Sequence, residues 1–248
     1  MQRFSEKTVL VTGGTSGIGL ATAKRLTEEG AKLIVTGHSE DHISATRKAL
    51  PDAVVLDNDV ASPEAAAVLA KTVKEQAGRL DAAFFNAGFG IFATLQEIDA
   101  NNVDRHVALN LRVPLLQAQA LAPLLQDGGA LLLISSATVG SPRADALVYS
   151  AIKAAVRQAA RSLATELAPR KIRVNVVAPG ATETNFHSRG GMSKEAQEEY
   201  KKKTAAMIPV KRLGQAEDVA AVACFLLSDD AGYVTGAEIR VDGGLSMA

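Results

Sequence analysis

The chain has 248 residues, 47% of them hydrophobic and 22% charged, a composition that suits one α/β domain with a large buried core. Lysine plus arginine equals aspartate plus glutamate at 27 each, and this zero net charge argues against nucleic acid or an anionic membrane as the main partner. Cys224 is the only cysteine, which excludes an intrachain disulfide, and no apolar run approaches the ~18 residues that a membrane span needs.

Strand-like apolar runs alternate with amphipathic stretches along the whole chain. In chain order we predict the strand Thr8–Thr12, the helix Ile18–Glu29, the strand Lys32–Thr36, the helix His42–Leu50, the strand Val54–Leu56, the helix Pro63–Gln76, the strand Ala82–Phe85, the helix Asn102–Leu125, the strand Ala130–Ile134, the helix Val148–Ala168, the strand Arg173–Val177, the helices Lys194–Met207 and Ala216–Leu227, and the strand Glu238–Val241.

Strands separated by helices pair in parallel through right-handed crossovers, and nearly continuous apolar strands indicate that helices cover both faces. We therefore predict a single α/β domain over residues 1–248, with a Rossmann-like doubly wound parallel sheet of about seven strands. The polar segment 185–209 interrupts the alternation and is predicted to be a substrate lid. The N-terminus lacks a signal-peptide pattern, so we expect a cytoplasmic protein.

Three spaced glycines lie between the first predicted strand and the first predicted helix. Gly13 permits a tight turn, Gly17 lets the main chain approach a pyrophosphate, and Gly19 allows close packing of the helix on the sheet. The N–H groups at the start of the helix then face the phosphates. A plain glycine-rich turn is the alternative, but the strand before it and the helix after it favour a dinucleotide site.

Tyr149 and Lys153 are four residues apart, which places them on one face of a helix. A phenol has an ordinary pKa of about 10, and a nearby ammonium group lowers that pKa toward the range useful for proton transfer. This spacing also occurs in ordinary surface pairs. Ser135 and Ser136 favour catalysis, because they follow the predicted strand Ala130–Ile134 at the edge where α/β sheets bind ligands.

Taken together, these residues resemble the short-chain dehydrogenase/reductase family over nearly the whole chain. Thr12–Gly19 is similar to the family's TGxxxGxG dinucleotide motif, and Asn86-Ala87-Gly88 is similar to its NAG motif. Further similarities are the adenine-contacting pair Asp59-Val60, the loop Pro179-Gly180 with Thr184, and the C-terminal motifs Arg212–Gly214 and Val241–Gly244. The positions of the catalytic tetrad hold Asn110, Ser136, Tyr149 and Lys153. Each motif alone is weak, but the ordered set is highly specific.

The resemblance implies a role for each member of the tetrad. Tyr149 would exchange a proton with the substrate oxygen, and Ser136 would hold that oxygen by a hydrogen bond. Lys153 would lower the pKa of Tyr149 and bind the cofactor ribose, and Asn110 would hold a water in a proton relay. Pro114 has no N–H group to bond the Asn110 carbonyl, which we interpret as a carbonyl freed for that water or as an ordinary kink.

The resemblance also implies a set of dinucleotide contacts and no metal. The expected contacts are Gly13, Thr15, Ser16, Gly17, Ile18, Gly19, Gly37, His38, Ser39, Asp59, Val60, Asn86, Ala87, Gly88, Tyr149, Lys153, Pro179, Gly180, Thr182 and Thr184. Enzymes that use NAD place an acidic residue after the second strand, where this chain has Gly37. His38 and Ser39 follow it, so we expect a preference for NADP(H), with NAD(H) as the alternative; His38 as a solvated loop residue is the competing interpretation.

We expect a small or mid-sized ketone or secondary alcohol as substrate, because the sequence offers no pair of basic groups for a carboxylate or an acyl carrier. Candidate pocket walls are Phe89, Ala137, Val139, Pro142, Arg143, Phe186, His187 and Met192. Excess apolar helix surface, together with the resemblance, implies a homotetramer. Two other functions fit part of the pattern: a non-catalytic dinucleotide-binding regulatory protein, which predicts the loss of Tyr149 or Lys153, and an adenosylmethionine-dependent methyltransferase, which does not explain the two residues.

Overall fold

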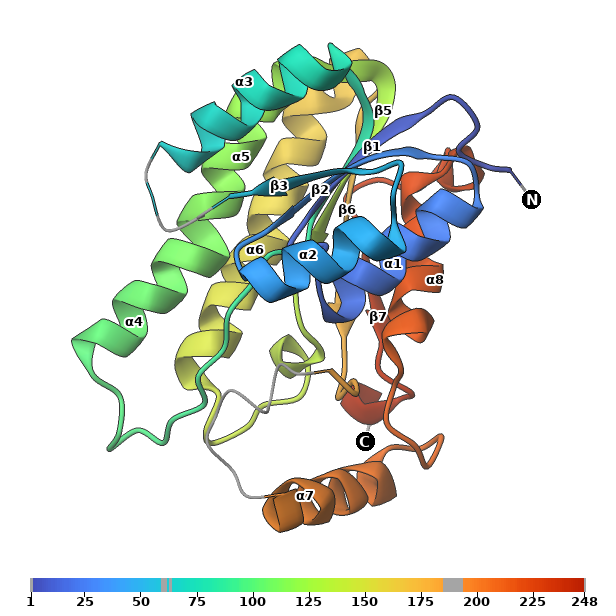
Figure 1. Cartoon of the computed structure of the whole chain (residues 1–248). Helices are drawn as coiled ribbons and strands as arrows, with labels where there is room; N and C mark the ends of the chain where they lie inside the picture. Colours follow the sequence, from blue (N-terminus) through green and yellow to red (C-terminus); the bar gives the residue numbers. More distant parts are fainter. Residues whose placement is uncertain (1, 59–61, 63, 185–193, 248) are drawn as a thin grey trace.

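A computed structural model describes residues 2–58, 62, 64–184 and 194–247, and within them seven parallel strands form one sheet in the order β3-β2-β1-β4-β5-β6-β7 (Figure 1). The strands are β1 (Thr8–Thr12), β2 (Lys32–Gly37), β3 (Val54–Asp57), β4 (Leu80–Phe85), β5 (Leu125–Ile134), β6 (Arg173–Pro179) and β7 (Glu238–Val241). The predicted doubly wound parallel sheet is confirmed.

Helices connect the strands and cover both faces of the sheet. They are α1 (Gly17–Glu28), α2 (Glu40–Ala49), α3 (Ala65–Ala77), α4 (Ala100–Val107), α5 (Val113–Leu121), α6 (Leu147–Leu167), α7 (Lys194–Met207) and α8 (Ala216–Leu227). In Figure 1, α3, α4, α5 and α6 lie on one side of the sheet, α1 and α8 lie on the other, and α7 lies beyond the end where the C-terminus is found.

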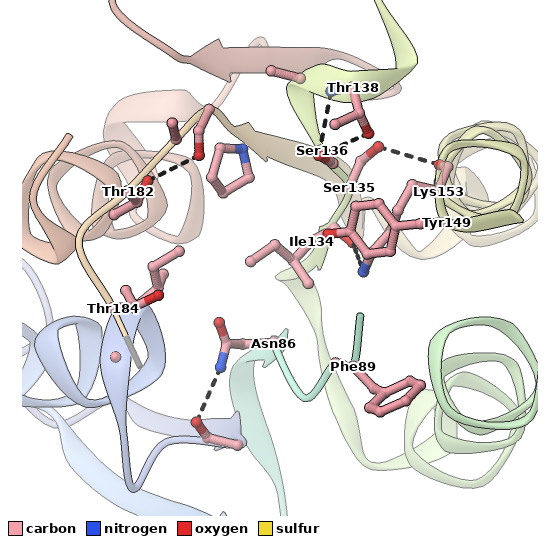
Figure 2. A pocket seen from close by; sticks show the side chains of 18 of the residues that line it. Asn86, Phe89, Ile134, Ser135, Ser136, Thr138, Tyr149, Lys153, Thr182 and Thr184 are labelled. Carbon is pink, nitrogen blue, oxygen red and sulfur yellow. Dashed lines mark hydrogen bonds between the residues drawn. The ribbon is translucent and has the colours of Figure 1, made fainter. Parts of the chain in front are cut away.

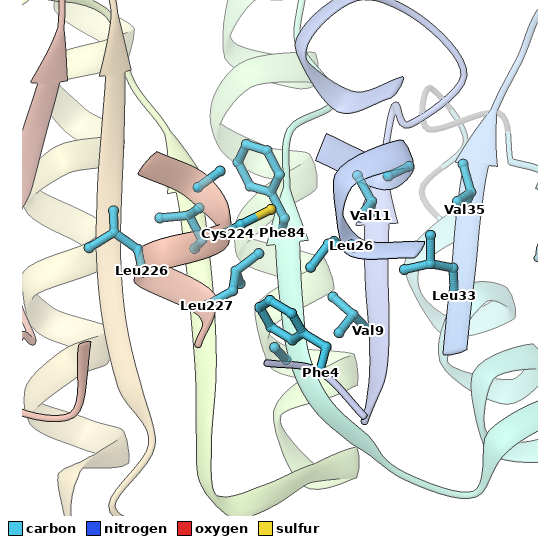
Figure 3. Close-up of a cluster of buried hydrophobic side chains, with 14 of the residues drawn as sticks. Phe4, Val9, Val11, Leu26, Leu33, Val35, Phe84, Cys224, Leu226 and Leu227 are labelled. Carbon is cyan, nitrogen blue, oxygen red and sulfur yellow. The ribbon is translucent and has the colours of Figure 1, made fainter. Parts of the chain in front are cut away.

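Alternation along the central strands divides the core into two layers. Val9 and Val11 of β1 point to the side of α1 and α8, whereas Leu10 points to the side of α3, α5 and α6. In the first layer Phe4, Phe84 and Cys224 are fully buried against the sheet (Figure 3). Both faces of the sheet are therefore buried, which explains why polar residues do not alternate with apolar ones along the strands.

The predicted long helix Asn102–Leu125 is wrong in two respects. A π-helical turn, Ala108–Arg112, separates α4 from α5, and Leu125 already belongs to β5, where it pairs with Leu80. Pro114 cannot donate the α-helical bond to the Asn110 carbonyl, and the Val113 N–H instead bonds the Ala108 carbonyl five residues back. The π-helical turn thus ends two residues before the proline.

The strand order reverses direction between β1 and β4, because the chain first builds outward to β3 and then returns to the other side of β1. In open α/β sheets, ligands bind beyond the carboxyl ends of the strands at such a reversal. The glycine turn after β1 and Asn86 after β4 lie there. Across the described part of the chain, no helix is both long and apolar enough to cross a membrane, and no group of three or more His, Cys, Asp or Glu side chains is arranged to hold a metal ion.

Candidate active site

The turn after β1 adopts a conformation that requires glycine. Gly13 has φ +61°, and a Cβ atom on it would lie 2.9 Å from the Ala87 Cα. The Asn86 Nδ2 group donates to the Thr12 and Gly13 carbonyls at 3.1 and 3.0 Å, so the turn after β1 and the segment after β4 are joined side by side. These two hydrogen bonds hold the glycine turn after β1 next to the segment after β4, on either side of the point where the strand order reverses.

The same turn leaves room for a phosphate group. Gly17 has φ +50°, and a Cβ atom on Gly19 would lie 2.3 Å from the Gly13 carbonyl oxygen, so neither position accepts a side chain without distortion. Helix α1 begins at Gly17, and its N-cap residue Ser16 makes no side-chain capping bond. The exposed N–H groups of this helix start and the bare glycine main chain fit the pyrophosphate of a dinucleotide.

The end of β2 holds the residues predicted to select the cofactor. A Cβ atom on Gly37 would lie 2.3 Å from the Thr15 Oγ1, so an acidic side chain has no space at this position. His38 is exposed, with its Nδ1 atom 3.7 Å from the Asp57 carboxylate. Ser39 caps α2 without a side-chain bond, and His42, which the sequence did not suggest, also lines the cavity here. The predicted adenine contacts Asp59 and Val60 lie outside the described residues.

Helix α6 carries Tyr149 and Lys153 into the cavity on the face predicted from their spacing. Both are buried, and the Lys153 ammonium lies 5.8 Å from the Tyr149 ring centroid. Lys153 Nζ also donates to the Ile134 carbonyl at 3.1 Å. In Figure 2, Ser136, Tyr149 and Lys153 lie on one side of the cavity and Thr182 and Thr184 on the other, with Asn86 between the two sides.

Burial dominates the electrostatics of this pair. Removal from water raises the pKa of Tyr149 to about 12, although a hydrogen bond with Ser136 acts in the opposite direction. Burial also lowers the pKa of Lys153 to about 8. Burial of the phenol thus has the largest effect on the pKa of Tyr149 in this structure, where the Lys153 ammonium bonds the Ile134 carbonyl, and the lowering of that pKa by Lys153 stays a prediction.

Ser136 and its neighbour Ser135 make different hydrogen bonds, which indicate different roles. The Ser136 Oγ accepts from the Thr138 N–H at 3.3 Å and from the Thr138 hydroxyl at 3.0 Å, and it lines the cavity beside Tyr149. The Ser135 hydroxyl donates to the Lys153 carbonyl at 3.2 Å, which ties β5 to α6. Ser136 thus has the geometry of a substrate contact, whereas Ser135 braces the helix that carries Tyr149.

Asn110 lies in the π-helical turn and its side chain is already paired with main chain. Its Oδ1 accepts from the Phe89 N–H at 3.0 Å, and its Nδ2 donates to the Phe89 carbonyl at 2.8 Å. Asn110 does not line the cavity itself. A water relay at this residue would therefore have to use the Asn110 main-chain carbonyl, the group that Pro114 cannot bond.

The loop after β6 closes the remaining side of the cavity. A Cβ atom on Gly180 would lie 2.7 Å from the Asp242 Cα, so this loop packs directly on the C-terminal motif. The Thr182 hydroxyl donates to the Gly180 carbonyl at 3.1 Å, and Thr182 pairs with Gly214. The two C-terminal motifs therefore brace this loop and lie behind the ligand cavity.

One continuous cavity of about 1120 Å³ connects these groups. Most predicted contacts line it, but Gly19 lies behind the turn. Predicted walls that line it are Phe89, Ala137, Pro142 and Arg143. Thr204 and Met207 of the predicted lid also line it, and further lining residues that the sequence did not suggest are Phe92, Leu109, Ile134, Thr138, Ser141, Ala181 and Leu245. Val139 does not line it, and Phe186, His187 and Met192 lie outside the described residues.

Comparison with known proteins identifies relatives over the full length. A family model described as enoyl-(acyl carrier protein) reductase matches residues 13–246. A levodione reductase of Leifsonia aquatica is 35% identical over 99% of this chain and 96% of its own length. A glucose 1-dehydrogenase of Gluconobacter oxydans is also 35% identical, over 99% of this chain and 94% of its own length.

Solved structures show the same architecture. A levodione reductase structure superposes with a TM-score of 0.92 at 34% identity and covers 99% of both chains. A short-chain dehydrogenase from Burkholderia cenocepacia, solved in complex with NADP, has a TM-score of 0.89 at 30% identity and covers 99% of this chain and 100% of its own.

Proposed function

This chain belongs to the short-chain dehydrogenase/reductase family, and we propose that it uses NADP(H) in preference to NAD(H) to interconvert a small or mid-sized ketone and its secondary alcohol. Its relatives establish the reaction class, an NAD(P)-dependent hydride transfer between nicotinamide and an alcohol or ketone. The observation that carries the proposed site is the buried pair Tyr149 and Lys153 beside Ser136, at one end of a cavity whose other end is the glycine turn.

The buried phenol is suited to donate a proton. With a pKa of about 12, Tyr149 keeps its proton throughout the neutral range. When bound, the reduced nicotinamide supplies the hydride to the carbonyl carbon. Tyr149 then gives its hydroxyl proton to the carbonyl oxygen, which becomes the alcohol, and the phenolate regains a proton from Lys153 or from solvent. Alcohol oxidation follows the same steps in reverse.

The neighbouring groups orient the reacting atoms. Ser136 holds the substrate oxygen next to the Tyr149 hydroxyl, as a donor aimed where negative charge develops. The partial charge of Lys153 near pH 8 lets it stabilise the phenolate and bond the ribose of the dinucleotide. Asn110 keeps the Phe89 main chain in place, and its own carbonyl would hold the relay water.

The preference for NADP(H) rests on the residues after β2. Gly37 itself brings no carboxylate to a 2′-phosphate, since a side chain at this position would meet Thr15, and the Asp57 carboxylate at the end of β3 faces the His38 imidazole at 3.7 Å. Two imidazoles, His38 and His42, and the unbonded Ser39 hydroxyl are the donors available for that phosphate. We expect kcat/KM to be at least tenfold higher with NADPH than with NADH; a higher value with NADH would contradict this preference.

The catalytic end of the cavity favours an uncharged substrate. Arg143 is the only arginine among the described lining residues, and the Asp145 carboxylate accepts from it at 2.7 Å while its guanidinium stacks on Phe92 at 5.0 Å. Phe89, Phe92 and Leu109 supply apolar walls. Residues 185–193 of the predicted lid lie outside the described residues, and Thr204 and Met207 of α7 line this end of the cavity.

We further propose a homotetramer in the cytoplasm. Leu147, Leu115, Leu116 and Val107 leave 54%, 38%, 37% and 37% of their surface exposed on α4, α5 and α6, which supports burial by other copies. Light scattering that gives the mass of a monomer would refute the tetramer. The single buried Cys224 suits a reducing compartment.

The Tyr149→Phe variant tests the function. It keeps the ring and removes the proton, so we expect turnover of a ketone panel, followed at 340 nm, to fall at least about a thousandfold. Dinucleotide affinity, measured by fluorescence titration, is expected to change less than about threefold. Turnover at the parental rate with the dinucleotide still bound would overturn the mechanism and revive the regulatory alternative.

A further inference from the structure

His106 is a buried titratable side chain that the proposed mechanism does not use. It lies near the end of α4, and none of its surface is exposed. Its ring centroid lies 5.1 Å from that of Phe89 and 6.1 Å from that of Tyr149. The imidazole therefore fills the space between the loop after β4 and the catalytic phenol.

Both ring nitrogens bond the main chain, and the partners define the protonation state. Nδ1 lies 2.8 Å from the Asn102 carbonyl oxygen, which only accepts, so Nδ1 carries the proton. Nε2 lies 3.2 Å from the Ile91 N–H, which only donates, so Nε2 carries the lone pair. The structure thus specifies a neutral imidazole with its proton on Nδ1.

The loop that His106 bonds is the one that forms the substrate end of the cavity. Phe89 and Phe92 of this loop line the cavity, and Phe92 meets the Tyr149 ring edge to face at 5.4 Å. Asn110 holds the loop at Phe89, four residues along the same helical region from His106. His106 holds it at Ile91, two residues further along the loop. Two side chains of one helical segment therefore fix successive points of the substrate wall.

We propose that His106 is a positioning residue: neutral imidazole pins the main chain at Ile91, and so sets where Phe89 and Phe92 stand against Tyr149 and the substrate. This inference rests on the proposed function and adds a residue to it. Protonation of Nε2 would place an N–H group against the Ile91 N–H, so the bond exists only in the neutral form. The substrate wall is consequently held in place only above the pKa of His106.

The charged groups around His106 are both cations, and each lowers the pKa of the imidazole. Arg105 lies on its own helix and stacks its guanidinium 4.4 Å from the Phe89 ring centroid, and Lys153 faces His106 from α6. Tyr149, the other titratable group of α6 near the ring, is neutral, and residues 86–92 contain no titratable group. Burial, Arg105 and Lys153 lower the pKa of His106, against the bond to Asn102, so the neutral form is favoured at pH 7.

Two variants of His106 separate positioning from simple filling of space. His106→Gln offers a carbonyl oxygen to the Ile91 N–H but does not titrate, whereas His106→Phe keeps a ring and makes neither bond. We expect His106→Phe to lower kcat/KM about tenfold, mainly through KM, and His106→Gln to recover most of that loss. The Val73→Ala variant, a fully buried position of α3 outside the cavity, controls for lost stability alone.

The pH profile of kcat/KM distinguishes positioning from a purely structural role, because loss of stability alone would not change that profile. The ratio of kcat/KM for His106→Gln to that of the parent is expected to be flat at neutral pH and to rise as pH falls. Half of the imidazole is neutral at its pKa and about one-tenth is neutral one pH unit lower, so the ratio should rise by up to about fivefold over that unit. A ratio that stays flat across the titration midpoint of His106, read from its own NMR signals, or equal losses in both variants and in Val73→Ala, would overturn the proposal.

An NMR measurement does not depend on turnover. Long-range ¹H–¹⁵N spectra are expected to show His106 as the neutral Nδ1–H tautomer at pH 7, and the Ile91 amide signal should shift with the same midpoint as the imidazole. A Nε2–H tautomer would refute the positioning role even in an active enzyme. Conversely, failure of Tyr149→Phe to abolish turnover would reject the proposed function while leaving this tautomer result intact.

Discussion

Replacing Lys153 by methionine is expected to make the dinucleotide-free protein more stable while it removes activity. Lys153 is 3% exposed, and burial lowers its pKa from 10.5 to about 8. A tenfold change in proton affinity corresponds to about 1.4 kcal/mol, so holding the charge inside the fold costs about 3 kcal/mol relative to water. Methionine has a similar length and carries no charge to desolvate.

Part of this gain is offset by a lost hydrogen bond. The Lys153 ammonium donates to the Ile134 carbonyl at 3.1 Å, and a bond from a charged donor contributes about 1.5 kcal/mol or more. The net stabilisation of Lys153→Met is then about 1–2 kcal/mol at pH 7. For a chain of this length, that stabilisation corresponds to a rise in Tm of about 2–8 °C. Catalytic groups commonly reduce stability in this manner.

The sign of the pH dependence follows from the lowered pKa. Below about pH 8 Lys153 is charged in both states, and the folded protein bears the full desolvation penalty. Between about pH 8 and 10.5 the folded protein releases the proton while the unfolded chain keeps it, so the free energy of unfolding of the parent rises with pH. The advantage of Lys153→Met should therefore shrink by pH 9.5.

Thermal unfolding followed by circular dichroism at pH 7 and pH 9.5 measures both effects. Lys48→Met, at an exposed position of α2, serves as the matched control and should leave Tm within about 1 °C at both pH values. A Lys153→Met variant that is less stable than the parent at pH 7 would refute the reasoning. So would a stability advantage that is the same at both pH values.

Three further changes test the cofactor end and the core. Gly37→Asp alone should weaken the binding of both NADPH and NADH in calorimetry, because its Cβ would lie 2.3 Å from the Thr15 hydroxyl oxygen. Adding Thr15→Gly should restore NADH binding. Tight NADH binding by the single variant would contradict this. Asn86→Ala removes two hydrogen bonds to carbonyls of the glycine turn and should raise the dinucleotide Kd about tenfold, with an unchanged Kd as the contrary result. Burial raises the pKa of Cys224 to about 12, so a disulfide reagent should modify this thiol at pH 8 only at the rate of unfolding; rapid native-state labelling would disprove its burial.

The fold was accessible from the sequence because local and global patterns agree. Every predicted strand appears, since the apolar runs are bounded by turns and separated by helical periodicity. The long helix before β5 was predicted incorrectly because periodicity does not reveal a change from α- to π-helical bonding. Pro114 follows the π-helical turn Ala108–Arg112 by two residues, but a proline at this position fits an ordinary kink as well. Leu125 fits a helical pattern but pairs with Leu80 as the first residue of β5.

The site was accessible only in part. Spacing correctly suggested that Tyr149 and Lys153 share a helix face, but the pKa of each depends on burial, which a motif does not report. His42 was missed because its helix offers only a solvated polar pattern, although it lines the cofactor end of the cavity. Phe92 was missed because an isolated aromatic residue in a loop carries no periodic signal. Both belong to the site through tertiary contact alone.

The polar groups near the catalytic phenol fall into two classes according to what they bond. Ser136 and Lys153 line the cavity, where a ligand can reach them. Asn110 instead bonds the main chain of Phe89 with both of its polar atoms, and His106 bonds the main chain of Ile91 and Asn102. Such a side chain makes no hydrogen bond of its own to the substrate. It affects the substrate by fixing the position of the main chain that it bonds. The predicted tetrad holds members of both classes, because it joins Asn110 to Ser136 and Lys153, and their hydrogen-bond partners separate the groups proposed to act on the substrate from those proposed to set the shape of the pocket.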